Sequence, residues 1–136
     1  MYLKMIKRRT ISVFGALALL FVLSACGSQK QEEAIEYQQI SAEEAKKIMD
    51  SGEEYILLDV RSEEEFAEKH IPGAVLIPHT EIADRAEEEL QDKEKKILVY
   101  CRSGNRSKIA AQMLADLGYT GVSEFGGISF WPYETE

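Results

Sequence analysis

One cysteine of this chain stands where a nucleophile could be activated. Cys101 follows a short apolar run, residues 97–100, and precedes a segment whose apolar side chains recur at helical spacing until Gly118 ends it. Residues 101–106, called the cysteine loop below, are therefore expected between the carboxyl end of a strand and the amino end of a helix. Unpaired backbone N–H groups and the helix dipole favour a negative charge there. The apolar positions of the helix are Ile109, Ala110, Met113, Leu114 and Leu117.

Two arginines in the cysteine loop strengthen this interpretation. Arg102 and Arg106 put fixed positive charge beside the thiol, which should lower the thiol pKa and give a reactive thiolate. Gly104 permits the tight backbone turn that a cradle for an anion needs. The alternative is a small buried cysteine in an ordinary turn. Two arginines within five residues of Cys101 favour a nucleophile beside an anion pocket.

The length of the cysteine loop separates two chemistries. Cysteine phosphatases carry five residues between the cysteine and an arginine that grips the phosphoryl oxygens. Here Arg106 comes after four residues, and Ser107 occupies the position that such an arginine would take. The shorter loop makes a narrower cradle, which suits a single sulfur atom on the cysteine better than a tetrahedral phosphate ester. A cysteine phosphatase or an arsenate reductase remains the enzymatic alternative.

Several separated motifs, in the expected order, make the chain resemble the rhodanese (sulfurtransferase) family. The motifs are LLDVRSEEEF at 57–66, HIPGAVLIP at 70–78, YCRSGNRS at 100–107, LGY at 117–119 and GGISFWPYE at 126–134. The resemblance covers nearly the whole chain from about Tyr37 to Glu134, and Lys69 stands where the family usually has glycine. It implies a rhodanese-like α/β fold with a mostly parallel five-stranded sheet and helices on both faces.

The resemblance also implies a mechanism. The Cys101 thiolate would take the outer sulfur of a small anionic donor such as thiosulfate, hold it as a persulfide, and pass it to a thiol or another thiophilic acceptor. Asp59 and Arg61 would lie near the cysteine loop and support it, although a surface ion pair is the alternative. No metal or organic cofactor is implied. The residues expected to bind the donor and the persulfide are Arg102, Ser103, Gly104, Asn105, Arg106 and Ser107.

A binding module is the competing class of function. Such a module would use the same pocket to carry a persulfide or to hold a partner without turnover. Slow turnover with tight association of a partner would favour it over the enzyme.

Short apolar strands alternate with helices along the chain. The capping-box spacing of Ser41 with Glu44, and of Ser62 with Glu65, predicts two helix starts, and residues 82–90 carry a further helix face. This alternation predicts a mostly parallel α/β sheet that is covered on both faces and binds ligands beyond the carboxyl ends of its strands. The predicted strands are residues 37–40, 55–60, 74–77, 97–100 and 122–125.

The remaining side chains of chemical interest are interpreted as structural. His70 and His79 have no cysteine or carboxylate cluster at the spacing of metal ligands, so no metal site is predicted. Phe130 and Trp131 are expected to pack over the end of the domain. The glutamates at 63–65 are expected to form a solvated first turn of a helix.

The amino-terminal segment has the pattern of a secretion signal. Four basic residues precede an apolar stretch, residues 11–23, which as a helix would span roughly 20 Å and fall short of the roughly 30 Å hydrocarbon core. A signal peptide is therefore favoured over the alternative, an uncleaved signal anchor. The sequence LSAC at 23–26 resembles a bacterial lipobox, with cleavage before Cys26 and acylation of its side chain.

These features predict three parts. Residues 1–25 form a lipoprotein signal peptide, residues 26–36 the lipidated cysteine and a flexible linker, and residues 37–136 one rhodanese-like domain. We expect a monomer on the outer face of the cytoplasmic membrane, attached to the membrane through the lipid alone. With Cys26 assigned to lipid, Cys101 is the one free thiol, and no intramolecular disulfide is available.

The charge of the chain excludes one class of partner. The chain has 16 basic and 24 acidic residues, and a formal charge of −8. Loss of residues 1–25 removes four basic residues and no acidic one, so the mature chain carries −12. Nucleic acid is not expected to bind such a surface. The basic residues of the cysteine loop therefore stand out against an acidic background.

Overall fold

The computed structural model describes residues 34–136. The predicted signal peptide, Cys26 and most of the linker lie outside the described residues, and they stay predictions. Within residues 34–136, no helix is long and apolar enough to cross a membrane.

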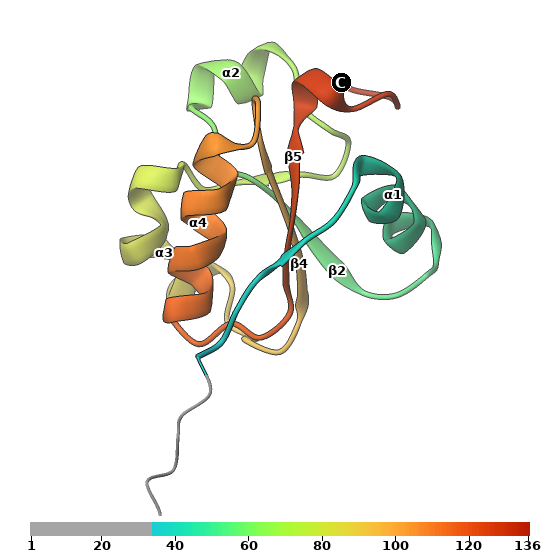
Figure 1. The fold of residues 1–136 in the computed structure, drawn as a ribbon. Coiled ribbons are helices and arrows are strands. Elements are labelled where there is room, and N and C mark those ends of the chain that lie inside the picture. The colour runs from blue at the N-terminus through green and yellow to red at the C-terminus, as the bar shows by residue number, and fades with distance from the viewer. Residues whose placement is uncertain (1–33) are drawn as a thin grey trace, which may run out of the picture. The chain divides into compact units, whose positions relative to one another are not determined.

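A five-stranded parallel sheet forms the centre of the domain (Figure 1). All five predicted strands are present, and every pairing is parallel, which confirms the predicted sheet. The central strand β4 is buried from Ile97 to Cys101, which explains its continuous apolar run. In spatial order the strands are β1 (Gln38–Gln39), β5 (Val122–Gly127), β4 (Lys96–Cys101), β2 (Tyr55–Asp59) and β3 (Val75–Leu76).

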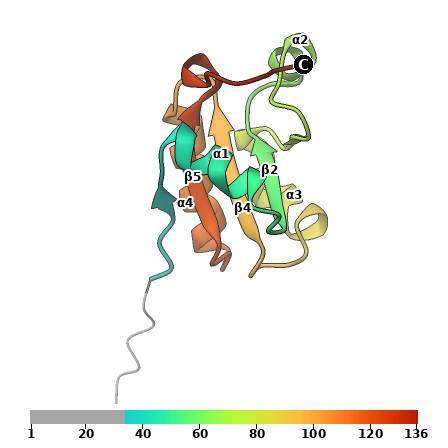
Figure 2. The ribbon, with the colours of Figure 1, turned by 90° about the vertical axis from the view of Figure 1, so that its right-hand side faces the viewer.

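Helices cover both faces of this sheet, as the resemblance implied (Figures 1 and 2). The helix α1 (Ala42–Asp50) packs on one face, and α3 (Ile82–Glu89) and α4 (Asn105–Asp116) pack on the other. Two hydrophobic clusters result, one on each side of the sheet. The short helix α2 (Glu63–Glu68) lies at the carboxyl ends of the strands, near the start of α4 (Figure 1).

Both predicted capping boxes begin helices. In α2, the Ser62 hydroxyl accepts a hydrogen bond from the Glu65 N–H at 3.2 Å, and the Glu65 carboxylate accepts one from the Ser62 N–H at 3.1 Å. Ser41 and Glu44 make the same pair of hydrogen bonds at the start of α1. The capping box at α2 matters for the site described below, because it fixes where the Glu65 carboxylate lies.

Ile109, predicted on the apolar face of a helix, and Phe130, predicted to pack over the end of the domain, are both exposed instead. Ile109 of α4 is 54% exposed, and Phe130 is 71% exposed. Phe130 ends the short helix η2 (Ile128–Phe130), while Ile128 in this helix and Trp131 directly after it are buried. The buried stripe of α4 is turned away from Ile109, so that smaller side chains face the sheet: Ser107, Ala110, Ala111, Leu114 and Ala115.

Candidate active site

Cys101 is the last residue of β4, and its side chain is buried. The backbone N–H of Gly104 donates a hydrogen bond to the cysteine Sγ over 3.1 Å. Gly104 has φ +103°, a left-handed conformation that glycine adopts without strain, and it directly precedes α4. The predicted cradle, between the end of a strand and the start of a helix, is therefore present around the sulfur.

The hydrogen bonds of this cradle control the charge of the sulfur. Burial raises the pKa of the Cys101 thiol, but hydrogen bonds from Ser107, Gly104 and Ser103 outweigh burial, and the net pKa lies below the ordinary value for cysteine. The direction agrees with the expectation from sequence. The leading cause differs, because hydrogen bonds from Ser107, Gly104 and Ser103 make the largest contributions that lower the pKa.

Ser107 connects the cysteine to a buried acid that sequence analysis did not single out. The Ser107 Oγ lies 3.4 Å from the Cys101 Sγ and 2.6 Å from Oε1 of Glu124. Glu124 belongs to β5 and is 2% exposed. Its Oε1 also accepts a hydrogen bond from the Gly126 N–H at 2.7 Å. The sequence offered no signal for its burial, because a charged residue in the predicted strand 122–125 indicates an exposed position.

Arg106 is held by a carboxylate rather than left free. Its Nη1 and Nη2 donate to the two oxygens of Glu65 at 2.6 and 2.9 Å. The Arg106 guanidinium lowers the pKa of Glu65 to about 2. Glu65 was predicted to be solvated, which is wrong: its side chain is 26% exposed and is committed to this pair. Donor binding by Arg106 stays a prediction, which would require sharing the guanidinium with Glu65.

Asp59 and Arg61 form a buried ion pair at the end of β2. The Arg61 Nη2 lies 2.6 Å from an Asp59 carboxylate oxygen, and both side chains are at most 5% exposed, so the alternative of a surface ion pair is wrong. The same Nη2 donates to the backbone carbonyl of Lys69 at 2.7 Å. The pair therefore ties β2 to the segment that follows α2.

An open pocket of about 480 Å³ lies beside the cysteine loop, between this loop and α2. Arg102 lines it, is exposed, and within residues 34–136 makes no ion pair. Ser103 and Asn105 are also exposed. Arg102 is thus the cysteine-loop arginine that can meet an anion without first losing a carboxylate. The residues that line the pocket are Arg61, Glu65, Glu68, Lys69, Arg102, Ile128 and Ser129.

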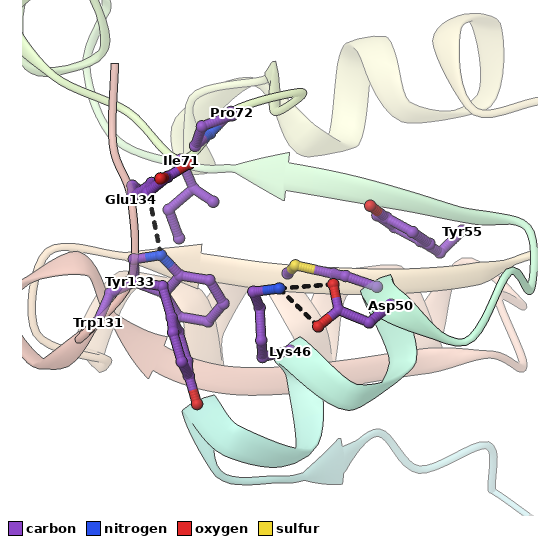
Figure 3. A pocket seen from close by; sticks show the side chains of 9 residues that line it. Lys46, Asp50, Tyr55, Ile71, Pro72, Trp131, Tyr133 and Glu134 are labelled. Atoms are coloured by element: carbon purple, nitrogen blue, oxygen red, sulfur yellow. Dashed lines mark hydrogen bonds and ion pairs between the residues drawn. The ribbon is translucent and has the colours of Figure 1, made fainter.

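A second pocket, of about 530 Å³, lies beside α1 and includes no residue of the cysteine loop (Figure 3). Lys46 points to Asp50 in an ion pair, and the Trp131 Nε1 donates to the Glu134 carbonyl at 3.2 Å. Lys46, Asp50 and Trp131 thus already have partners within the pocket, and no cysteine, serine or threonine lines it. In the described part of the chain, no group of three or more His, Cys, Asp or Glu side chains could hold a metal ion.

Sequence comparisons point to one family. The family model described as a rhodanese-like domain matches residues 41–132. A Bacillus subtilis protein named as a sulfurtransferase, YtwF, is 37% identical over 102 residues, which cover 75% of this chain and 97% of that protein. The thiosulfate sulfurtransferase PspE of Escherichia coli is 37% identical over 71 residues, covering 52% of this chain and 68% of PspE.

A further relative and a solved structure agree with this family. The Bacillus subtilis protein YrkF, named as a sulfur carrier protein, is 38% identical over 111 residues. That match covers 81% of this chain and 59% of YrkF, so the chain spans less than two thirds of this relative. The rhodanese-like domain of the Anabaena protein Alr3790 has a TM-score of 0.66 at 32% identity, covering 72% of this chain and 77% of that chain.

The ion pair of Glu65 with Arg106 predicts a pH dependence of stability. Because the folded-state pKa of Glu65 is lowered from 4.5 to about 2, the pair stabilises the fold above the unfolded-state pKa, and this contribution is lost as the pH falls towards 2. Glu65→Gln should therefore lower the free energy of unfolding near pH 6, with a difference from wild type that shrinks towards pH 3. Urea denaturation at several pH values measures this difference.

The exposed neighbour Glu64 provides the control for this measurement. Glu64→Gln removes the same charge from the same helix turn but breaks no ion pair, so its effect should be small at every pH. A difference between wild type and Glu65→Gln that stays constant from pH 6 to pH 3 would contradict the prediction.

Proposed function

We propose that this chain, which belongs to the rhodanese-like domain family, transfers a sulfane sulfur from an anionic donor to a thiophilic acceptor through a persulfide on Cys101. The observation that carries the proposal is the hydrogen bond from the Gly104 N–H to the buried sulfur, inside a loop that lowers the thiol pKa. Relatives that are named as sulfurtransferases support the same chemistry.

The proposed reaction has two displacements at sulfur. The Cys101 thiolate attacks the outer sulfur of the donor, the sulfur–sulfur bond of thiosulfate breaks, and sulfite leaves with the bonding electron pair. An acceptor thiolate then attacks the outer sulfur of the persulfide, and Cys101 leaves as a thiolate. Backbone N–H groups of Ser103, Gly104 and Asn105 would hold the negative charge on the outer sulfur between these steps.

Arg102 is the residue that we propose selects the donor. Its guanidinium is exposed at the pocket beside the cysteine loop, and it can meet two oxygens of a sulfonate group in a bidentate pair. The carboxylate of 3-mercaptopyruvate is flat and set back from its sulfur, so it fits this pair less well. We therefore propose thiosulfate as the better donor of the two.

A persulfide carrier that does not turn over rapidly is the second candidate. The relative YrkF, named as a sulfur carrier protein, favours it. The cysteine phosphatase is less well supported, because Ser107 at the position of the phosphatase arginine is buried and bound to Glu124.

We further propose that the domain is a monomer tethered by lipid on Cys26 to the outer face of the cytoplasmic membrane, with the lipobox as support.

Persulfide formation on Cys101 is tested by intact-mass analysis. The full chain with Cys26→Ser keeps Cys101 as its one cysteine. Incubation with thiosulfate should add the mass of one sulfur atom, and the further change Cys101→Ser should abolish this gain while the nearly isosteric serine preserves the fold. A phosphoryl adduct from an aryl phosphate, or a sulfur adduct on the chain without cysteine, would reject the proposal. Counting the sulfur atoms that each protein molecule transfers to an acceptor thiol distinguishes a carrier, which transfers one, from an enzyme, which transfers many.

The role of Arg102 predicts a change in donor preference. A lost charged hydrogen-bond contact typically costs on the order of 1.5–3 kcal/mol, so Arg102→Gly should lower kcat/KM for thiosulfate roughly ten- to a hundredfold. The value for 3-mercaptopyruvate should change much less. Arg102→Lys is the matched variant, because it keeps the charge without the bidentate geometry, and it should give an intermediate loss. An unchanged preference ratio in Arg102→Gly would show that Arg102 does not select the donor.

The lipid anchor predicts a change in location. Cys26→Ser removes the acylated side chain, so the protein should remain as an unprocessed precursor or be released to the medium. Membrane fractionation with mass analysis of the amino terminus measures both outcomes. Recovery of the wild-type chain from the cytoplasm with residues 1–25 attached would contradict the proposed location.

A further inference from the structure

The pocket beside the cysteine loop is larger than the proposed donor requires. Its volume of about 480 Å³ lies in the range of sites that hold organic molecules, roughly 300–1,000 Å³. Thiosulfate is a compact inorganic ion, and the proposed bidentate pair with Arg102 holds it by its oxygens alone. Space and charged side chains therefore remain in this pocket for the second substrate, the acceptor of the sulfur.

Five charged side chains line the pocket, and two of them, Arg61 and Glu65, are bound in the ion pairs described above. Glu68, Lys69 and Arg102 are exposed, and within residues 34–136 none of the three forms an ion pair. Two unpaired cations against one unpaired acid give the pocket an excess of positive charge, on a chain whose formal charge is −8. The pocket is therefore suited to anionic substrates.

The backbone that carries Lys69 is held from two sides. Its N–H donates a hydrogen bond to the Glu65 carbonyl at 3.2 Å, which closes the last turn of α2. Its carbonyl accepts a hydrogen bond from Nη2 of the buried Arg61 at 2.7 Å. The buried ion pair at the end of β2 therefore fixes the point from which the Lys69 side chain extends.

Arg102 extends from the wall that the cysteine loop forms. Its carbonyl accepts a hydrogen bond from the N–H of Ser129, which also lines the pocket, at 3.1 Å. The two unpaired cations thus come from different segments, Lys69 directly after α2 and Arg102 directly after Cys101. Arg102 suits a donor whose oxygens lie close to the transferred sulfur. Lys69, on the α2 side, suits a substrate whose anionic group is separated from its sulfur by a carbon chain.

The ammonium group of Lys69 can bind a carboxylate on the acceptor. It is a compact charge with three rotatable donors, so it accepts a carboxylate from several directions in a charge-assisted hydrogen bond. An acceptor thiol has to bring its sulfur to the outer sulfur on Cys101, so the other end of the acceptor extends into the pocket. A carboxylate at that end gains attraction from Lys69, whereas an ammonium group at that end is repelled.

We propose that Lys69 selects the acceptor of the sulfur by binding the carboxylate of a small thiol. The acceptor thiolate attacks the outer sulfur of the persulfide, the sulfur–sulfur bond breaks, and Cys101 leaves as a thiolate with the bonding electron pair. The acceptor departs as a persulfide that keeps its carboxylate. The inference rests on the proposed function for the persulfide on Cys101. Lys69 stands where the rhodanese-like family usually has glycine, so this preference belongs to this chain and not to the shared fold.

The experiment loads Cys101 with sulfur and measures the second-order rate constant of transfer to three thiols. The full chain with Cys26→Ser is used, and sulfite and excess thiosulfate are removed before the thiol is added. The thiols 3-mercaptopropionate, 2-mercaptoethanol and cysteamine share a short chain and end in a carboxylate, a hydroxyl and an ammonium group. Lys69→Gln should lower the ratio of the rate constants for 3-mercaptopropionate and 2-mercaptoethanol roughly two- to fivefold, because water screens an exposed charge and limits its effect.

The sign of the effect is tested with the other charges. Lys69→Gln should raise the ratio for cysteamine over 2-mercaptoethanol, and Glu68→Gln should raise the ratio for 3-mercaptopropionate. Lys69→Arg keeps the charge and should retain most of the preference. Lys108→Gln is the matched control, because Lys108 is exposed and does not line the pocket. It removes the same charge and should keep the ratio of the unchanged chain.

Three kinetic results would overturn the inference. The first is a ratio for 3-mercaptopropionate that is the same in Lys69→Gln as in the unchanged chain. The second is an equal fall of this ratio in Lys108→Gln, which would show a general effect of charge. The third is a loss in the rate of loading by thiosulfate in Lys69→Gln that equals the loss for 3-mercaptopropionate, which would assign Lys69 to anions in general.

Binding without chemistry separates the inference from the proposed function. The probe 3-(methylthio)propionate keeps the carboxylate but has no thiol, so it cannot accept sulfur. In NMR titrations of the unloaded chain it should shift the backbone amide signals of Lys69 and Arg102, and Lys69→Gln should weaken its binding roughly two- to fivefold. Equal binding in Lys69→Gln would overturn the inference even if no persulfide forms on Cys101. Failure of loading, with binding that still depends on Lys69, would reject the proposed function and support the carboxylate site.

Discussion

A buried sulfur that must carry negative charge is the constraint on which the site depends. Cys101 is 1% exposed, so water cannot stabilise a thiolate there, and the backbone of the cysteine loop has to supply the donors. Gly104 turns its N–H to the sulfur through a left-handed conformation. Gly127 of β5 lies against the same loop so closely that a Cβ would collide with the Arg102 carbonyl. The strand order, with β5 beside β4, is therefore part of the cradle.

Charge pairing around the cradle determines which groups remain available to a ligand. Glu65 fills two roles, since its carboxylate caps α2 through the Ser62 N–H and holds the Arg106 guanidinium. The buried pair of Asp59 and Arg61 fixes the end of β2 in a similar way. Because these cations are neutralised, the pocket beside the cysteine loop is less basic than the sequence suggested. Its attraction for an anion rests on Arg102 to a large extent.

The sequence was sufficient for the features that depend on local pattern. The five strands, the capping boxes of α1 and α2, and the position of Cys101 at a strand end follow from apolar periodicity and from residue types a few positions apart. The ion pair of Glu65 with Arg106 was missed because the two residues are 41 positions apart, a separation at which sequence spacing carries no information. Ile109 was misplaced because the small residues of α4 allow close packing on a different stripe.

Glu124 shows a further limit of prediction from local sequence pattern, and it also connects β5 with the cysteine through Ser107. A charged residue in a strand indicates an exposed position when only the sequence is known. Here, however, the Ser107 hydroxyl and the Gly126 N–H donate hydrogen bonds to the buried carboxylate. The cost of burying an acid is offset only if the acid has something to bind, and the hydroxyl that it binds also touches the nucleophile.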